Sequence, residues 1–155
     1  MTLESNLAAH GLYLHGVAKL SAEEIETYCL PAEYSMVALV GNTGSSYWPY
    51  FSQSSEFIDG DPDPLDRWSK RIAADIAVEF SVQPVFPSDG PPYFPFQRWA
   101  YRAEGLSASP LGILIHPHRG LWHSYRFALL CQLEPTQVAD QSCPGTVVST
   151  PRSAR

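Results

Sequence analysis

The sequence has few cysteines, few charged residues and no long uninterrupted apolar run. Its three cysteines, Cys29, Cys131 and Cys143, share no metal-binding spacing, and so sparse and odd a number is typical of a reducing compartment rather than of a disulfide scaffold. No stretch reaches the roughly 18 apolar residues that a membrane span requires. The N-terminus lacks the basic, apolar and small-residue order of a signal peptide. We therefore expect a cytoplasmic protein with no membrane partner.

The charge composition excludes a second class of partner. Charged residues make up 17% of the chain, the net charge is −6, and there is no block of like charge. Nucleic-acid binding needs clustered Lys and Arg to neutralise phosphates, so we expect no nucleic-acid partner. The 155 residues, 45% of them apolar, suit one globular domain with a real core.

The hydrophobic pattern mixes short strands with helices, which predicts an α+β domain. Strands are predicted at residues 12–20, 34–40 and 83–86, with a hairpin formed by residues 111–115 and 121–130. Helices are predicted at residues 3–10, 21–29, 64–80 and 96–103. Ser21 and Glu24 form a capping box, and Asp63 is expected to cap the helix that Pro64 begins. We assign residues 1–133 to a single α+β domain and residues 134–155, which are polar and lack periodicity, to a mobile C-terminal tail.

A glycine- and serine-rich loop, residues 41–46, follows the predicted strand 34–40. Such a loop can bind an anion through its backbone N–H groups. It lacks both the P-loop lysine and the three-glycine dinucleotide spacing. A tight strand-to-helix turn is at least as good an interpretation.

The segment 109–132 carries the densest group of polar and aromatic residues in the chain. Strand alternation predicts two faces, with Trp122, Ser124, Arg126 and Ala128 on one and His123, Tyr125, Phe127 and Leu129 on the other. An arginine in so apolar a strand must have a partner or face a cavity, because burying it alone is too costly. Two interpretations of Arg126 stay open: it binds an anionic group of a ligand, or it forms a buried pair with Glu104 or Asp89.

Three histidines in this segment raise the question of a metal. His116 and His118 have the spacing of a ligand pair on a strand, and His123 or Asp89 would have to supply a third ligand. No motif fixes a carboxylate ligand, so we predict no metal held by the protein. The cysteines have no histidine at a recognisable spacing, which argues against a nucleophilic cysteine, and no catalytic residue can be assigned.

Several motifs, in the same order along the chain, resemble two known families. The run Ile115-His116-Pro117-His118-Arg119-Gly120-Leu121-Trp122, followed by Tyr125-Arg126, resembles a segment of the cobalamin-processing proteins of the methylmalonic aciduria and homocystinuria type C family. Asp63-Pro64-Leu65-Asp66 and residues 94–98 are similar to two other segments of that family. The hairpin and residues 10–19 are also similar to the cobalamin-binding N-terminal domain of epoxyqueuosine reductases. Together the resemblance covers about residues 10–132.

The resemblance implies a nitroreductase-like fold with a central, mainly antiparallel sheet flanked by helices. It implies cobalamin as the cofactor, with FMN or glutathione as further candidates, and reductive removal of the upper axial ligand, or hand-over of the cofactor, as the function. The residues that would contact the cofactor are Gln97, His116, Trp122, Tyr125 and Arg126. Aromatic walls would come from Trp48, Tyr50, Tyr93, Phe94, Phe96 and Trp99. A homodimer or a downstream cobalamin-accepting protein would be the partner.

The chain departs from both families in ways that leave an alternative open. It has no cysteine cluster after Cys131, so no iron–sulfur cluster is expected in this chain, and Pro91 stands where the reductases carry a catalytic aspartate. Of the arginines that bind glutathione in the processing family, only Arg126 has a counterpart. The alternative is a non-enzymatic or electron-transfer accessory domain, related to epoxyqueuosine reductases and ferredoxin-like proteins, that has lost its iron–sulfur tail.

Overall fold

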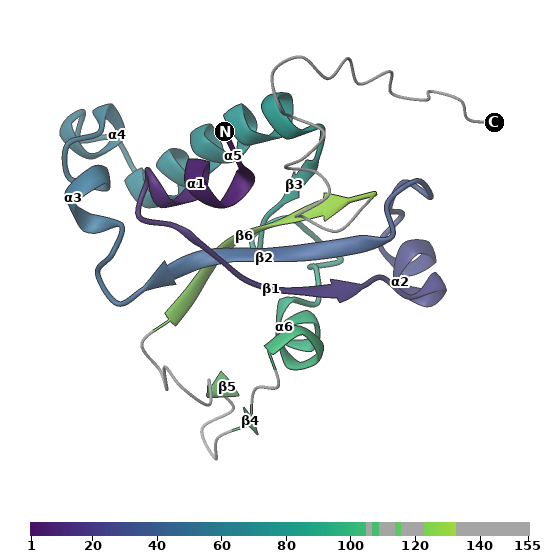
Figure 1. Cartoon of the computed structure of the whole chain (residues 1–155). Helices are drawn as coiled ribbons and strands as arrows, with labels where there is room; N and C mark the ends of the chain where they lie inside the picture. Colours follow the sequence, from purple (N-terminus) through teal and green to yellow (C-terminus); the bar gives the residue numbers. More distant parts are fainter. Residues whose placement is uncertain (105–106, 109–113, 116–122, 133–155) are drawn as a thin grey trace.

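The computed structural model describes residues 1–104, 107–108, 114–115 and 123–132 (Figure 1). Its helices are α1 (Leu3–Ala8), α2 (Ala22–Thr27), α3 (Trp48–Phe51), α4 (Ser55–Ile58), α5 (Pro64–Phe80) and α6 (Phe96–Glu104). Its strands are β1 (Tyr13–Lys19), β2 (Met36–Thr43), β3 (Gln83–Val85), β4 (Ser107–Ala108), β5 (Leu114–Ile115) and β6 (His123–Cys131). The structure does not describe the predicted C-terminal tail, residues 134–155. Three residues singled out by the sequence analysis also lie outside the described residues: His116, His118 and Trp122.

Four strands form an antiparallel sheet in the order β1-β2-β6-β3. Strand β2 lies between β1 and β6, as expected of a continuous apolar run. The sequence predicted a hairpin between residues 111–115 and 121–130. This pairing is wrong for the described parts of the two segments, β5 and β6, which lie in different sheets. Strand β6 uses its two edges for β2 and β3, whereas β5 pairs with β4 in a separate two-stranded sheet.

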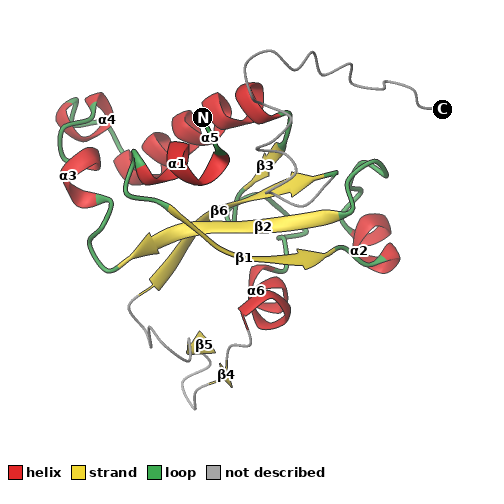
Figure 2. Ribbon diagram, in the orientation of Figure 1, coloured by secondary structure: helices red, strands yellow, loops and turns green. Residues whose placement is uncertain are grey.

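Helices cover both faces of the four-stranded sheet, which confirms the α+β class (Figure 2). On the first face, which we call the α5 face, side chains of α1 and α5 pack against Ala38, Val40, Phe127 and Leu129. On the second, the α6 face, side chains of α6 pack against Val37, Leu39, Ala128 and Leu130. Because neighbouring residues of β2 and β6 point to opposite cores, residues 36–40 of β2 and 127–131 of β6 are all apolar and buried.

The ends of two helices test the predicted caps. The capping box at α2 is confirmed, with the Ser21 hydroxyl accepting from Glu24 N and the Glu24 carboxylate accepting from Ser21 N. The predicted side-chain cap at α5 is wrong. Asp63 has left-handed backbone angles, φ 54° and ψ 51°, and its side chain makes no capping hydrogen bond. Within the described residues, no helix combines the length and apolarity required to cross a bilayer.

Candidate functional site: a pocket at the bulge of β6

Strand β6 carries a β-bulge at Arg126. Val40 of β2 is opposite Phe127, but the next residue, Gly41, is opposite Tyr125, so Arg126 is an extra residue in β6. A bulge of this kind bends the strand and redirects side chains. Arg126 therefore lies on the α5 face, on the same side as Phe127, and the predicted alternation is wrong at this point. Tyr125 packs on the α6 face.

Gly41 is the residue that allows the two strands to approach at the bulge. A Cβ atom built on Gly41 would lie 1.9 Å from the carbonyl oxygen of Ser124, which is far inside van der Waals contact. Because that neighbour is backbone, it cannot move aside by a change of rotamer. The glycine that the sequence analysis assigned to an anion-binding loop or a turn therefore has a packing role. The loop after it is a turn in which Ser46 N donates to Thr43 O, and it leads into α3.

The guanidinium of Arg126 is half-buried and has only one hydrogen bond to a described residue. Its Nε donates to Asn42 Oδ1 at 3.0 Å, and its Cζ lies 5.3 Å from the centre of the Tyr47 ring. Burial lowers the pKa of Arg126, and Asp66 and Tyr47 partly offset that effect. Among the described residues no carboxylate forms an ion pair with it.

Of the two interpretations left open for Arg126, the ion pair with Glu104 or Asp89 does not occur. Asp89 Oδ2 accepts from Phe86 N at 3.0 Å, which closes the turn after β3. The Glu104 carboxylate accepts from the hydroxyl of Tyr125 on the opposite face of the sheet. Both carboxylates thus have other partners, and the cavity interpretation of Arg126 is the one that the geometry supports.

Arg126 lines a pocket of about 400 Å³. Three elements form its walls: α5, the segment after β3, and β6. The lining residues are Asp66, Ser69, Lys70, Phe86, Pro87, Ser88, Tyr125 and Arg126. Lys70 Nζ lies over the Phe86 ring, 5.6 Å from its centre. The walls thus combine an aromatic surface with two cations and one carboxylate, a composition suited to an anionic organic ligand.

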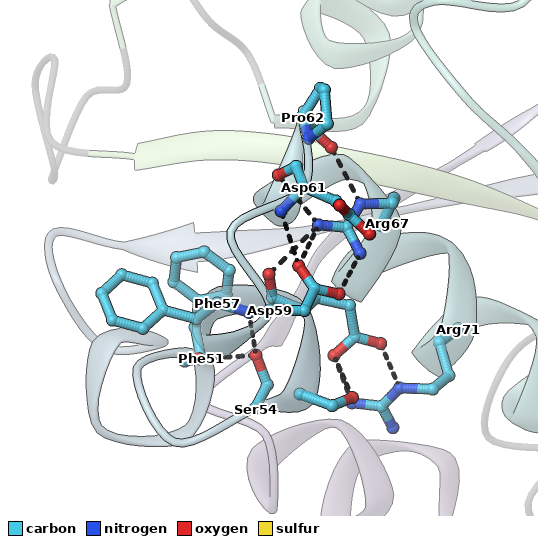
Figure 3. Close-up of polar contacts among 10 residues, drawn as sticks. Phe51, Ser54, Phe57, Asp59, Asp61, Pro62, Arg67 and Arg71 are labelled. Atoms are coloured by element: carbon cyan, nitrogen blue, oxygen red, sulfur yellow. Dashed lines mark hydrogen bonds and ion pairs between the residues drawn. The ribbon is translucent and has the colours of Figure 1, made fainter.

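The position of α5, which supplies three of the lining residues, is fixed at its N-terminus by Arg67 (Figure 3). Arg67 donates to both carboxylate oxygens of Asp59 at 2.9 Å, to Pro62 O at 2.8 Å and to Asp61 O at 3.1 Å. These bonds tie the first turn of α5 to the preceding loop, but, because arginine only donates, they do not satisfy the free N–H groups that a side-chain cap would. They lower the pKa of Asp59, chiefly through the hydrogen bond from Arg67.

A second ion pair holds α5 to α4. Arg71 donates from Nε to Glu56 Oε1 at 2.5 Å and from Nη2 to Glu56 Oε2 at 3.1 Å (Figure 3). This hydrogen bonding lowers the pKa of Glu56 to about 2. Arg67 and Arg71 therefore have carboxylate partners, in contrast to Arg126.

The α6 face carries polar groups of a different kind. Glu24 is 2% exposed and accepts four hydrogen bonds, one from Ser21 N, one from Trp99 Nε1 and two from Arg102. Burial alone would raise the pKa of Glu24, but the hydrogen bonds from Arg102 and Ser21 outweigh it and lower the pKa. These contacts connect α2 to α6.

The structure brings two of the five predicted site residues together. Tyr125 and Arg126 line the pocket, although the Tyr125 ring also contacts His15, with ring centres 5.7 Å apart. Gln97 is exposed on α6 and does not line the pocket. His116 and Trp122 lie outside the described residues.

The expected aromatic walls come from other residues. Phe96 and Trp99 are buried in the core of the α6 face, and Trp48, Tyr50 and Tyr93 are exposed away from the pocket lining. Phe86 supplies the aromatic wall instead. The sequence analysis also missed the polar residues of α5 that line the pocket, Asp66, Ser69 and Lys70. Their spacing of three and four residues places them on one helix face, and that signal could have found them.

No group of three potential metal ligands occurs within the described part of the chain. Cys29 is exposed on the loop after α2 and Cys131 is buried in β6, and neither lines the pocket. Neither the protein-family models nor the curated proteins give a match to this chain. The functional interpretation therefore depends on the chemistry of the pocket and on the order of the motifs.

Proposed function

We propose that this protein binds a cobalamin-type cofactor in the cytoplasm and removes its upper axial ligand or passes the cofactor on. The single observation that carries the proposal is the half-buried guanidinium of Arg126, which forms no ion pair with a described carboxylate and lines a pocket of about 400 Å³. A buried cation without a carboxylate lowers stability, and such a cost is typical of a functional site. The position of Arg126 in the motif that resembles the cobalamin-processing family supports a corrinoid as the ligand.

The finer fold assignment belongs to the same proposal. A nitroreductase-like scaffold is supported by the antiparallel order β1-β2-β6-β3 and by helices on both faces of the sheet. On this scaffold, the segment that carries Tyr125 and Arg126 forms one wall of the ligand site.

The pocket has room for one part of such a cofactor. Its volume of about 400 Å³ lies at the lower end of the range of small-molecule sites, roughly 300–1,000 Å³. A corrin ring with its amide side chains and nucleotide tail is larger. Arg126 and Lys70 would attract an anionic group, Phe86 would cover its apolar neighbour, and the walls would exclude water from it. The reductive chemistry would be that of the bound cobalt, with the protein controlling access and orientation.

A spectroscopic titration tests the proposal. Cyanocobalamin and methylcobalamin, each added to the purified chain at up to tens of micromolar, should give the shift that marks loss of the lower axial base. Arg126→Met should weaken the apparent affinity by about tenfold to a hundredfold, since it removes a charge-assisted contact worth about 1.5–3 kcal/mol. Arg98→Met, at an exposed arginine of α6, is the matched control and should leave the affinity unchanged. An unchanged spectrum with both cobalamins would refute the proposal.

The pocket volume also favours a second candidate, a binding or electron-transfer accessory domain that takes a smaller anionic molecule such as FMN or glutathione. The same titration distinguishes the two candidates. Binding of FMN or glutathione by a chain that gives no cobalamin spectrum would select the accessory function. Because no cysteine lines the described pocket, a thiol would have to come from the ligand.

A further inference from the structure

Ser69 in the middle of α5 has a buried hydroxyl group that the fold does not use. The residue is 3% exposed, and within the described part of the chain its Oγ makes no hydrogen bond. A serine inside a helix normally bonds the carbonyl four residues earlier or points to solvent. Ser69 does neither, and it lines the same pocket as Arg126. A buried hydroxyl with no partner destabilises the folded chain, so it calls for an explanation from function.

Arg126 presents a second set of unused donors to this pocket. Only its Nε is occupied, by Asn42 Oδ1, and neither Nη atom has an acceptor among the described residues. The Asn42 bond and the Tyr47 ring hold the guanidinium in place. Within the described chain, the Ser69 hydroxyl and both Nη atoms of Arg126 lack an acceptor, and both residues line the same pocket.

The geometry of the donors selects among anions. A carboxylate has about four acceptor positions on its two oxygens, so it could accept from the fork and from the hydroxyl, but it brings a single negative charge that is spread in one plane. A neutral amide would leave the guanidinium uncompensated. A tetrahedral phosphoryl group has enough oxygens to accept from the fork and from the hydroxyl together, and Lys70 adds a second positive charge. The lining has one opposing charge, Asp66, so the two cations leave a net positive charge.

We propose that this pocket is a phosphoryl-binding site, with Arg126 and Ser69 as its ligands to the phosphoryl oxygens. The phosphodiester of the nucleotide tail of cobalamin and the phosphomonoester of FMN offer the same chemistry. If the ligand is cobalamin, this inference rests on the proposed function. If the ligand is FMN, the inference stands without it.

Two pairs of ligands test the inference: FMN and riboflavin differ only in the phosphoryl group, and cyanocobalamin and dicyanocobinamide differ in the nucleotide tail that carries it. Affinities for cyanocobalamin and dicyanocobinamide, and for FMN and riboflavin, are measured by calorimetry at fixed ionic strength, with inorganic phosphate as a competitor. The phosphorylated member of at least one pair should bind about tenfold or more tightly. Inorganic phosphate should reduce that preference. Equal affinities within both pairs would overturn the inference.

Substitutions of Arg126 and Ser69 test whether these two residues cause the preference for the phosphorylated ligand. Arg126→Met should remove most of it, and Ser69→Ala should reduce it about threefold to tenfold. Asp66→Asn, which removes the opposing carboxylate, should instead raise the affinity for the phosphorylated member. Arg98→Met is the control for loss of a positive charge elsewhere. A preference that survives in both Arg126→Met and Ser69→Ala would overturn the inference.

The Ser69→Ala variant is expected to fold normally, because the hydroxyl that it removes has no partner among the described residues. Its melting temperature should equal or exceed that of the unmodified chain, so a loss of ligand affinity would report on the site. A fall in melting temperature of several degrees would show that Ser69 Oγ has a structural partner, and would overturn its role as a ligand.

The results separate this inference from the proposed function. Equal binding of cobalamin and cobinamide would refute the phosphoryl site for the corrinoid and leave cobalamin binding intact. Absence of corrinoid binding, together with a preference for FMN over riboflavin that depends on Ser69 and Arg126, would refute the proposed function and support the phosphoryl site.

Discussion

Two buried charges lie on opposite faces of the same sheet, and their surroundings differ. Glu24 on the α6 face accepts four hydrogen bonds, whereas Arg126 on the α5 face donates one to a described residue. The carboxylate of Glu24 joins α2 to α6, and its pKa is lowered because its donors outweigh the effect of burial. The pKa of Arg126 is lowered by burial, and no described carboxylate forms an ion pair with it.

On the proposed function, Glu24 has a structural role and Arg126 a ligand-binding role. A buried charge that receives its full set of hydrogen bonds stabilises the elements that supply them. A buried charge with free donors beside a cavity lowers stability and provides binding energy for a ligand. Mutations on the two faces should therefore affect different quantities. Mutation of Glu24 on the α6 face should lower the unfolding free energy, and mutation of Arg126 on the α5 face should lower ligand affinity.

The largest expected effect is at Gly41, where a substitution disturbs the bulge that separates the two faces. In Gly41→Ala the new methyl group would clash with the Ser124 carbonyl, so β6 must shift. We expect a loss of about 3 kcal/mol in unfolding free energy, within the range of overpacked sites, together with weaker ligand binding. Urea denaturation measures the first quantity and calorimetry the second.

Gly44 is the matched control for this substitution. It has positive φ, +54°, but a Cβ atom would meet no heavy atom within 4 Å. Gly44→Ala should therefore cost only the backbone strain, about 1 kcal/mol, and leave binding unchanged. Equal losses in the two variants would show that the contact between Gly41 and Ser124 does not determine the bulge.

The next effect is expected at Glu24 and concerns the α6 face alone. Glu24→Ala leaves the Trp99 N–H buried without its acceptor, while the guanidinium of Arg102, which is 36% exposed, can regain water. We expect a loss of about 2–3 kcal/mol in unfolding free energy, with ligand affinity kept in the molecules that remain folded. The exposed neighbour Glu23 provides the control. A Glu24→Ala variant that keeps its stability but loses binding would reverse the assignment of the two faces.

Much of the fold could be predicted from the sequence because local chemistry determines it. The stripe Leu65, Trp68, Ile72, Ile76 and Phe80 indicates α5, and most of these residues are buried in the core. The capping box of α2 also depends only on residues three apart. The short helices α3 and α4 were missed, since four residues are too few to show a helical period.

The site could not be predicted in full, because it depends on contacts between distant segments. Periodicity places Arg126 on the face of Ala128, and only the bulge opposite Gly41 moves it to the α5 face. The partners of Arg126 illustrate the same limit. Asn42 and Tyr47 are about 80 positions earlier in the chain, and no spacing rule connects them with β6.

The smallest expected effect is on the ion pair between Glu56 and Arg71. This pair tests whether a guanidinium without a carboxylate partner is particular to Arg126 at the pocket. Arg71 is on the same helix as Ser69 but has a carboxylate partner, and its hydrogen bond lowers the pKa of Glu56 to about 2. Because the folded pKa lies below the ordinary value near 4.5, the ionised carboxylate stabilises the fold above about pH 4.5. This stabilisation is lost as the pH falls toward 2.

Glu56→Gln should therefore lower the unfolding free energy by about 1 kcal/mol at pH 7, a modest loss because the Arg71 side chain is 47% exposed. The difference from the unmodified chain should shrink between pH 5 and pH 2, as followed by urea denaturation. Glu26→Gln, at an exposed position of α2, should show no such pH dependence. A difference that stays constant with pH would mean that the pair does not hold α4 to α5. Glu56→Gln should also leave phosphoryl binding unchanged. That result would show that Arg71 has a structural role and that the ligand site is confined to Arg126 and its neighbours.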